Sequence, residues 1–386
     1  MSVTTLIKDR TAIAGIGMAP YGRGIESSEE HLAGMAVKQA LDDAGIDAAE
    51  VDGLVSYDME VTALEEMASN MGLGDLRFIA HTSCGGGGSC AGVGLGAMAI
   101  VTGQADVVVA WRSRKRSSKE SRWWMNQPSI VRDRQMWLRP HGVVRTADEI
   151  AFMARRYMHE YGATQDHFAN VALAFRRHAN LNPTAVMHEK KMTRESYHTS
   201  RYVADPLRLY DCCLETDGAC ALVLVSAERA KDLKQKPVYV HAAAQGISRD
   251  SSIMVQWYAE DMMRTQAVAC AEGLWKHSDI RPKDIKVAEM YDAYTPEILF
   301  TLEGYGFCGR GEAGPFTDDG NIELGGRLPI NTNGGSLSDA YLHGFNLVIE
   351  GVKQMRGTST AQVQDADTCF VSGSDLVPTS AMVLRR

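Results

Sequence analysis

The first half of the chain alternates short apolar runs with longer amphipathic stretches. Unbroken or alternating apolar runs predict β-strands, whereas apolar residues three and four positions apart predict helices. Ala105–Trp111 is almost entirely apolar, which predicts a strand in a sheet covered on both faces. By this pattern we expect strands at residues 11–19, 51–57, 77–82, 105–111 and 218–226, and helices at 29–44, 63–71 and from Gly88 to about 101.

From Arg112 to about Asp205 the pattern becomes charged and aromatic, with helical stretches such as Ala147–Tyr161. The apolar strand pattern returns only at Gly218. A long segment of different character between two strands of one sheet predicts an insertion. We therefore expect an inserted cap at about residues 113–205.

The second half restarts the alternation. Thr295 is expected to cap a helix, with Pro296 at its first position and Glu297 in its first turn. A glycine-rich stretch then precedes another apolar run. The expected strands are residues 238–244, 286–293, 328–332, 368–373 and 380–384, and the further helices are 262–277 and one from about Asp339.

An internal repeat supports this division. An offset of 234 residues pairs Ile46 with Ile280, Tyr57 with Tyr291, and Asp58 with Asp292. Both halves also place a glycine cluster between a strand and a helix. The sequence therefore predicts an α/β protein of two similar, duplicated halves, at residues 1–230 (with the cap) and 231–386.

Composition narrows the class of protein. The net charge of -8 argues against a nucleic-acid partner. Ala91–Val101, the longest apolar stretch, is too short and too rich in glycine to span a bilayer. Met1–Arg10 shows no signal peptide, and the eight cysteines form no CxxC pairs, so we expect free thiols in the cytoplasm.

No cofactor or metal site is apparent. Gly15-Ile-Gly17-Met-Ala-Pro20 imitates a dinucleotide fingerprint, but Pro20 replaces its third glycine and no helix is expected to begin there. The eleven histidines have no spacing that suits a divalent metal. We expect chemistry without a resident cofactor or metal.

Several motifs resemble the sterol-carrier-protein branch of the thiolase superfamily, in the order found in that family. The resemblance covers the chain from about Thr11 to its C-terminus and implies the thiolase fold. The motifs are the glycine cluster from Gly85 with Gly103-Gln-Ala-Asp-Val-Val-Val, Leu207-Arg-Leu-Tyr-Asp-Cys-Cys-Leu-Glu-Thr-Asp-Gly-Ala, Glu289-Met-Tyr-Asp-Ala-Tyr-Thr, and Asn331-Thr-Asn-Gly-Gly.

The departures from the family pattern affect the catalytic residues. The nucleophilic cysteine of the family would fall near Gly87, and its C-terminal catalytic cysteine near Gly373. Tyr291 and Tyr341 replace the two catalytic histidines. No nucleophile remains at these positions for a Claisen reaction through an acyl-cysteine.

This pattern of replacements resembles the bacterial steroid side-chain-cleaving aldolases. The resemblance implies retro-aldol cleavage of a 17-hydroxy-20-carboxyl-CoA steroid to a 17-ketosteroid and propionyl-CoA. It also implies an OB-fold domain supplied by a partner acyl-CoA hydratase in a heterotetramer. The chain itself is expected to form a homodimer across edge strands near Arg77–Ser83.

Such a cleavage needs a base, an acid and a site for the enolate oxygen. We expect Tyr341 to be the base and Tyr291 the acid; otherwise both are buried aromatics with satisfied hydroxyls. Backbone N–H groups in glycine turns suit an enolate, unless the glycines only permit tight turns. The candidates for the enolate site are Gly86, Gly87, Gly88, Gly334, Gly335 and Gly373.

Other polar residues are candidates for supporting roles. Asp292, Asn331, Asn333 and His343 could orient the tyrosines, although a structural role is the commoner one for such residues. The one dense basic run could bind the phosphates of CoA, although such runs are more often solvated faces. Its candidate side chains are Arg112, Arg114, Lys115 and Arg116.

Two other functions stay open on sequence grounds. A non-canonical acyl-CoA acyltransferase could use Cys84 or Cys90 as its nucleophile. A lipid or acyl-CoA carrier would need no catalytic residues.

Overall fold

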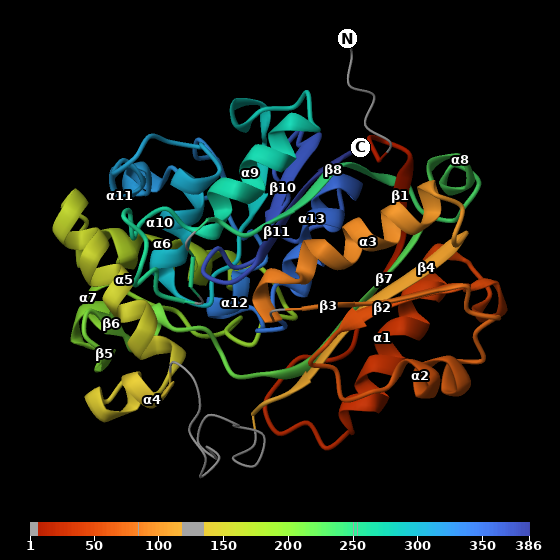
Figure 1. The fold of residues 1–386 in the computed structure, drawn as a ribbon, viewed down its shortest axis with the longest axis horizontal. Helices are drawn as coiled ribbons and strands as arrows, with labels where there is room; N and C mark the ends of the chain where they lie inside the picture. Colours follow the sequence, from red (N-terminus) through yellow and green to blue (C-terminus); the bar gives the residue numbers. More distant parts are fainter. Residues whose placement is uncertain (1–6, 84, 118–134, 250, 253) are drawn as a thin grey trace.

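The computed structural model describes residues 7–83, 85–117, 135–249, 251–252 and 254–386. Within this part of the chain, nine strands form one mixed sheet in the order β3-β2-β4-β7-β1-β8-β11-β10-β9 (Figure 1). The strands are β1 (Thr11–Met18), β2 (Gly53–Tyr57), β3 (Phe78–Thr82), β4 (Val107–Lys115), β7 (Asp217–Ser226), β8 (Val238–Gly246), β9 (Val287–Glu289), β10 (Thr368–Ser372) and β11 (Thr379–Arg385).

The sheet confirms the two similar halves. In the first half β2 pairs with β4 in parallel, and β4–β7 and β7–β1 are antiparallel. In the second half β9 pairs with β10 in parallel, and β10–β11 and β11–β8 are antiparallel. The halves meet where β1 pairs with β8 at Ala12 and Ile13. This arrangement of two equivalent halves is the one that the resemblance implies.

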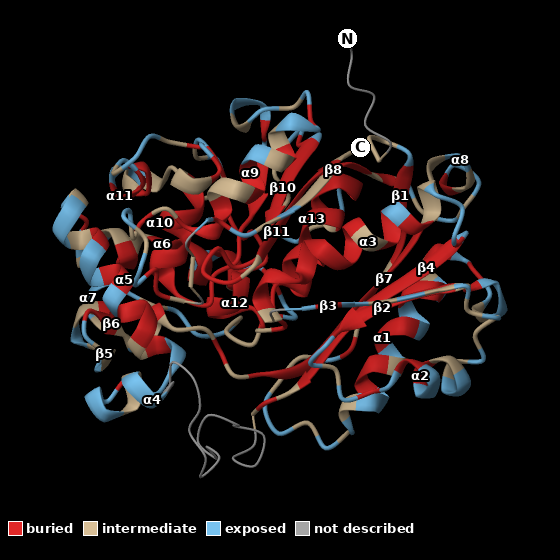
Figure 2. Ribbon diagram, viewed as in Figure 1, coloured by how far each residue is buried: buried red, intermediate tan, exposed pale blue. Residues whose placement is uncertain are grey.

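Helices α3 (Ser89–Val101) and α13 (Phe345–Arg356) form an inner layer. Each contacts strands of both halves, and the two helices contact each other near the middle of the molecule (Figure 1). Most of their residues are buried, as Figure 2 shows for α13. Their burial explains why the apolar residues of 91–101 cover nearly the whole circumference of the helix.

Two helices cover the outer faces. Helix α1 (Glu29–Ala44) packs on β1 and β7, and α9 (Gln266–Lys276) packs on β8 and β11. A Cβ atom at Gly17 would lie 2.0 Å from the carbonyl oxygen of Ala36 in α1. The paired glycines at 15 and 17 thus allow close helix packing, which accounts for the imitation of a dinucleotide fingerprint.

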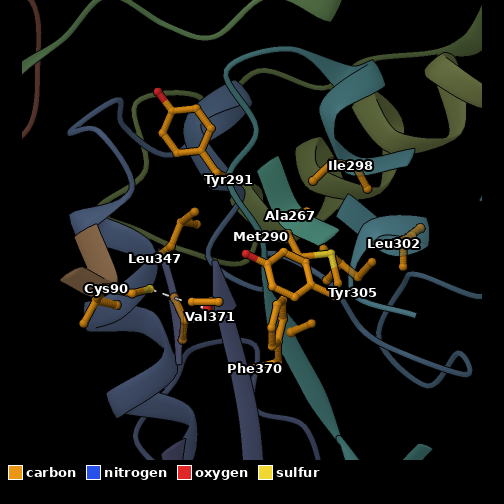
Figure 3. Packing of buried hydrophobic residues seen from close by; sticks show 14 of the residues in the cluster. Cys90, Ala267, Met290, Tyr291, Ile298, Leu302, Tyr305, Leu347, Phe370 and Val371 are labelled. Carbon is orange, nitrogen blue, oxygen red and sulfur yellow. Dashed lines mark hydrogen bonds between the residues drawn. The ribbon is translucent and has the colours of Figure 1, made fainter. Parts of the chain in front are cut away.

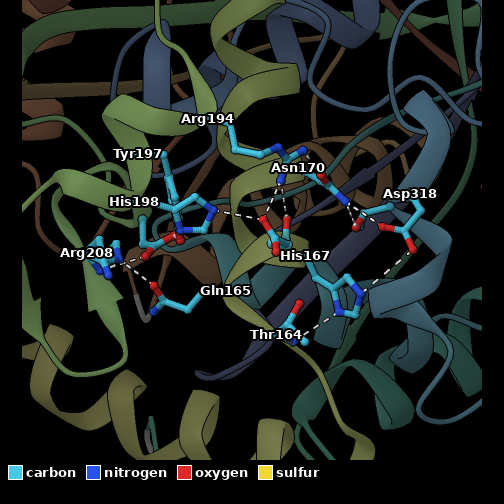
Figure 4. Close-up of polar contacts among 12 residues, drawn as sticks. Thr164, Gln165, His167, Asn170, Arg194, Tyr197, His198, Arg208 and Asp318 are labelled. Atoms are coloured by element: carbon cyan, nitrogen blue, oxygen red, sulfur yellow. Dashed lines mark hydrogen bonds and ion pairs between the residues drawn. The ribbon is translucent and has the colours of Figure 1, made fainter.

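The cap lies at the side of the sheet and packs on the C-terminal half. Its helix α6 (Gln165–Ala179) contacts α10 (Thr295–Gly304) and α12 (Gly335–Ser338). Figure 4 shows the polar contacts, in which Asn170 donates to Asp318 at 2.8 Å. The other cap elements are α4 (Gln135–Leu138), η3 (Arg139–His141), α5 (Thr146–Tyr161), α7 (Arg194–Thr199), β5 (Tyr202–Ala204) and β6 (Leu207–Arg208).

Short helices complete the described fold. They are α2 (Leu64–Met71), α8 (Ala227–Ala230), α11 (Ala313–Phe316), η1 (Ala48–Glu50), η2 (Gly85–Gly87), η4 (Leu209–Asp211), η5 (Pro282–Asp284) and η6 (Asp318–Gly320). Among the described residues, no helix has both the length and the apolar character needed to cross a bilayer.

Three expectations about local structure were wrong. Residues 328–332 form only an isolated bridge from Ile330 to Ala288 rather than a strand. The helix expected from Asp339 begins at Phe345, because His343 and Gly344 adopt left-handed φ values of 52° and 81°. Thr295 is the first residue of α10 rather than its cap, because its hydroxyl donates to Asp211.

Candidate active site

Tyr291 and Tyr341 meet in the interior of the C-terminal half. Their hydroxyl oxygens are 2.8 Å apart, which is a hydrogen bond. Their rings lie edge to face, with centroids 6.3 Å apart. Figure 3 shows Tyr291 directed away from the surrounding apolar core. The structure therefore brings together the two tyrosines that the sequence singled out.

Side-chain hydrogen bonds hold each tyrosine in place. Tyr291 lies two residues beyond β9, where Asn331 accepts from the amide of Met290 and donates to its carbonyl, both at 2.7 Å. Tyr341 lies between α12 and α13, and its amide donates to Thr216 Oγ1 at 2.9 Å. Tyr341 was expected in the first turn of a helix, so that expectation was wrong.

Asp292 caps the short helix α12. Its carboxylate accepts from the amides of Ser336 at 2.8 Å and Leu337 at 3.1 Å. Burial raises the pKa of Asp292 to about 7, although these amide bonds favour the charged form. Asp292 is therefore a structural residue that fixes the loop after Tyr291.

The amides of Gly334 and Gly335 are already used within their own loop. Gly334 donates to the carbonyl of Asn331, and Gly335 donates to the side chain of Asn333, both at 2.9 Å. Asn333 in turn donates to Asp339 at 2.8 Å. In this arrangement the two glycines have no free amide for an enolate oxygen. The expectation that they bind the enolate is therefore wrong, and their amides stabilise the loop instead.

The glycine cluster after β3 lies directly against Tyr291. A Cβ atom at Gly86 would be 2.2 Å from the Tyr291 hydroxyl oxygen, and one at Gly373 would be 2.7 Å from the carbonyl oxygen of Gly86. A Cβ atom at Gly87 would clash with Pro378, and one at Gly88 would clash with Thr82. The amide of Gly373 donates to Ser380 at 2.8 Å. Gly86 lies in the turn that leads into α3, where the amide of Gly88 donates to the carbonyl of Gly85 at 3.0 Å and that of Ala91 to Ser380 Oγ at 2.9 Å.

Arg112 is buried and cannot be a surface site for CoA phosphates. It forms a salt bridge of 2.5 Å with Glu60, and its guanidinium lies 4.8 Å from the ring centre of Tyr57. It also donates to His343 Nδ1. The sequence left open that the basic run is a solvated face. Instead, Arg112 to Lys115 are the last residues of strand β4, and all but Lys115 are buried.

The other basic candidates are also held by the fold. Arg114 and Arg116 are buried, and Lys115 Nζ donates to the carbonyls of Glu26 and Ser27. The positive charge of Arg116 acts on Tyr341, where it lowers the pKa of the phenol against the larger, opposite effect of burial. The basic run thus contributes its charge to the site rather than to a surface.

Burial dominates the electrostatics of the tyrosine pair. It raises the pKa of Tyr291 well above its usual value, and the neighbouring Tyr341 and Glu297 raise it further. Burial also raises the pKa of Tyr341, but the hydrogen bond with Tyr291 and the charge of Arg116 oppose the rise. Of the two phenols, Tyr341 has the surroundings that better tolerate negative charge.

The structure does not place Cys90 as a nucleophile. Cys90 lies in α3, where its thiol donates to the carbonyl of Val371 at 3.5 Å (Figure 3). Burial raises the pKa of this thiol, which disfavours the reactive thiolate. Cys84 lies outside the described residues.

Three residues near the tyrosines escaped the sequence analysis. Glu297 accepts from Ser374 Oγ at 2.9 Å, and the amide of Ser374 donates to the carbonyl of Gly86 at 3.0 Å. Glu60 is the third. Its position three residues after the strand at 51–57 was a signal, because polar residues beyond strand ends often serve sites. Among the described residues, no group of three His, Cys, Asp or Glu side chains could hold a metal ion.

Two family models match the chain. The thiolase N-terminal domain matches residues 11–228, and the thiolase C-terminal domain-like family matches residues 248–384. The chain is 44% identical to a 17-hydroxy-3-oxo-4-pregnene-20-carboxyl-CoA lyase of Mycobacterium tuberculosis, with 98% of this chain and 100% of that protein covered. It is 41% identical to a steroid side-chain-cleaving aldolase of Thermomonospora curvata, with 98% and 99% covered.

Solved structures show the same relationship. The chain superposes on the "Ltp2-ChsH2(DUF35) aldolase" with a TM-score of 0.92 at 41% identity, and 99% of each chain is covered. Human mitochondrial 3-ketoacyl-CoA thiolase gives a TM-score of 0.69 at 13% identity, also with 99% of each chain covered. The second likeness concerns the fold alone.

Proposed function

The chain belongs to the thiolase superfamily and, within it, to the steroid side-chain-cleaving aldolases, and on that premise we propose that it cleaves a 17-hydroxy-20-carboxyl-CoA steroid to a 17-ketosteroid and propionyl-CoA. The reaction is a retro-aldol cleavage. A base removes the proton of the 17-hydroxyl, the C17–C20 bond breaks, and its electron pair forms the thioester enolate. Protonation of C20 completes propionyl-CoA.

The hydrogen-bonded pair Tyr291–Tyr341 carries this proposal. Two phenols 2.8 Å apart can pass a proton between them, so one can accept the hydroxyl proton while the other returns a proton to C20. The pair stands where the resemblance places the catalytic histidines of thiolases. Tyr341 acts as the base, which its hydrogen bond with Tyr291 and the nearby charge of Arg116 favour. Tyr291 acts as the acid.

The enolate oxygen binds at the turn η2–α3. Gly86 lies against Tyr291, and the N-terminal end of the 13-residue helix α3 carries a partial positive charge. Gly86, Gly87 and Gly88 let the thioester approach the backbone closely. Gly373 supports this turn from the neighbouring strand end.

The acyltransferase alternative is less well supported. Cys90 is sealed in the core and bonded to a carbonyl, so it offers no nucleophile. A pure carrier would have no need of the hydrogen-bonded tyrosine pair. Neither a metal nor an organic cofactor takes part, and activity should survive treatment with a chelator unless a partner protein supplies a structural metal.

The enzyme works in the cytoplasm as a homodimer with an OB-fold partner domain. Strand β3 is one of the two edge strands of the sheet, and Ile79 on it is 61% exposed. An apolar hollow of about 820 Å³ lies beside this edge, lined in part by Phe78, Leu95 and Met98. The partner is a DUF35 domain, which the name of the matching solved structure, "Ltp2-ChsH2(DUF35) aldolase", supports. The proposed assembly is a heterotetramer.

The test is product analysis by mass spectrometry. The chain and the partner domain are incubated with a 17-hydroxy-20-carboxyl-CoA steroid, and equal amounts of the 17-ketosteroid and propionyl-CoA are expected. Release of acetyl-CoA or transfer of an acyl group to free CoA would favour a thiolase instead. Tight binding without turnover would favour the carrier.

A further inference from the structure

His343 has an unusual position beside the tyrosine pair. It adopts a left-handed φ of 52°, which costs energy for a residue other than glycine. Its ring packs edge to face on Tyr341, with centroids 5.1 Å apart. The Cε1 atom lies 3.8 Å from the place where a Cβ atom of Gly85 would stand. The histidine therefore lies between the base and the glycine turn of η2.

The contacts of His343 fix its tautomer. Arg112 approaches Nδ1 with Nε at 3.2 Å and Nη2 at 2.9 Å. A guanidinium can only donate hydrogen bonds, so Nδ1 must be the acceptor and the ring proton must sit on Nε2. His343 thus presents an N–H group at Nε2.

The same contacts keep the imidazole neutral. Burial lowers the pKa of His343 well below its usual value, and the charges of Arg112 and Arg116 lower it further. Glu60 holds Arg112 in place through the 2.5 Å salt bridge, and the same carboxylate accepts from the amide of Ser113 at 2.9 Å. Arg112 and Glu60 are positioning residues for the histidine.

The Nε2–H group has no acceptor among the described residues. In the same part of the chain, Nε2 of His178 and Nε2 of His241 are buried from solvent and have no hydrogen-bond partner. Nε2 of His343 is not among such atoms. A polar hydrogen kept in position without a partner in this part of the chain is available to a ligand. The ring that carries this group packs on Tyr341, and its Cε1 and Nδ1 edge faces Gly85 at the start of the η2 turn.

We propose that His343 is a further catalytic residue, whose Nε2–H donates to the thioester carbonyl oxygen and strengthens that hydrogen bond as the oxygen becomes an enolate. This inference rests on the proposed retro-aldol function. A neutral imidazole suits the role because it stabilises the oxygen without giving up its proton. The loss of one such donor lowers turnover by about 100- to 1,000-fold.

The decisive variant is His343→Asn. Asparagine tolerates the left-handed backbone, and its side-chain oxygen can still accept from Arg112, but its side chain cannot reach the position of Nε2. A role as acceptor for Arg112 would therefore survive this change, and a donor role at Nε2 would not. His188→Asn is the matched control, because His188 lies in the cap and its Nδ1 is 3.4 Å from the carbonyl oxygen of Ala179.

Two activities are measured: kcat and KM for steroid cleavage, and deuterium exchange at C2 of propionyl-CoA in D2O, which reports enolate formation alone. We expect H343N to lose at least about a hundredfold in kcat and in exchange, with little change in KM and an unchanged melting temperature. H188N should match the wild type in all of these.

The possible outcomes separate the two proposals. A wild type that cleaves and exchanges, together with an H343N variant within about threefold of it, would overturn the role of His343 alone. A wild type that does neither would overturn the proposed function and this role with it. Should H343N fail to fold, the nitrogen-15 spectrum of histidine-labelled wild type decides. A proton on Nδ1 would overturn the inference.

Discussion

Gly86 lies so close to Tyr291 that a Cβ atom there would be 2.2 Å from both the hydroxyl oxygen and the carbon that bears it. No side chain larger than hydrogen fits this contact unless the phenol moves. The resemblance to thiolases places the lost nucleophilic cysteine one residue further on, near Gly87. A Cβ atom at Gly87 would lie 1.8 Å from the carbonyl oxygen of Pro378, so neither position has room for a nucleophilic side chain. The glycine at position 86 is required to receive the phenol of the opposite half.

Gly86→Ala should therefore impair catalysis more than folding. The added methyl group would displace the Tyr291 hydroxyl by about 1 Å, and a displacement of this size lowers kcat by about a hundredfold. Gly92→Ala is the matched control in the adjoining helix, because its Cβ atom would only touch Val55 and Thr82 at 3.7 and 3.9 Å. It should keep full activity and raise stability by about 0.5–1 kcal/mol. Equal activity of the two variants would contradict the prediction.

Tyr291→Phe and Tyr341→Phe each remove one hydroxyl and leave the packing intact. Since each hydroxyl handles a proton in the cleavage, each change should lower kcat by at least about a hundredfold, with an unchanged circular dichroism spectrum. Cys90→Ala should leave most of the activity, because the thiol serves only packing and a bond to Val371. Cys84→Ala should do the same. Normal turnover in both phenylalanine variants would place the active site elsewhere.

Asp9 should make stability depend on pH at the acid end. Partial burial raises its pKa, but hydrogen bonds from His241 and Arg385 outweigh burial and bring the pKa down to about 2. A carboxyl group with a lowered pKa stabilises the fold above its unfolded value of about 4, and this contribution is lost as the pH falls toward 2. Asp9 also has a left-handed φ of 56°, which asparagine tolerates.

Asp9→Asn should accordingly lower the melting temperature by roughly 1–3 °C at pH 7. The difference from the wild type should shrink as the pH is lowered to 3. Calorimetry at the two values checks this. A difference that grows toward low pH would show that the carboxylate contributes no net stability.

Ile79→Lys should break the proposed homodimer. Ile79 is 61% exposed on the outermost strand β3, and a charged side chain on an edge strand opposes pairing with a second strand. Val61→Lys, at a position that is 72% exposed but off the sheet, is the control. Sedimentation at micromolar concentration should give a monomer for the first variant and a dimer for the second. A monomeric wild type would refute the proposal.

The strands and the long helices were readable from the sequence because their residues follow apolar periods. Helix α1 was expected at its observed bounds, where Ser28 caps its start and Gly45 ends it. The loop that carries Tyr341 was not readable. Its path depends on side-chain bonds of Asp292 and Asn333 and on the left-handed His343, none of which alters the apolar pattern.

The sequence predicted the two tyrosines of the candidate site but not the surroundings of the basic run. Tyr291 and Tyr341 could be found because the resemblance aligned them with catalytic positions. The basic run was misread because the partner of Arg112 is Glu60, which lies 52 residues earlier in the chain. A salt bridge across such a separation leaves no local signal, so a buried arginine and a surface arginine look alike in the sequence.

The two ends of the sheet differ in a way that limits growth of the assembly. Beyond β9, the segment around Ile330 bonds to Ala288 through Pro329 and Asn331 and covers that border. The border at β3 has no such cover among the described residues. Strand addition is thus possible on one side only, and two molecules related by a twofold axis use up both free borders. Edge-to-edge strand pairing therefore stops at the dimer and cannot continue into a fibril.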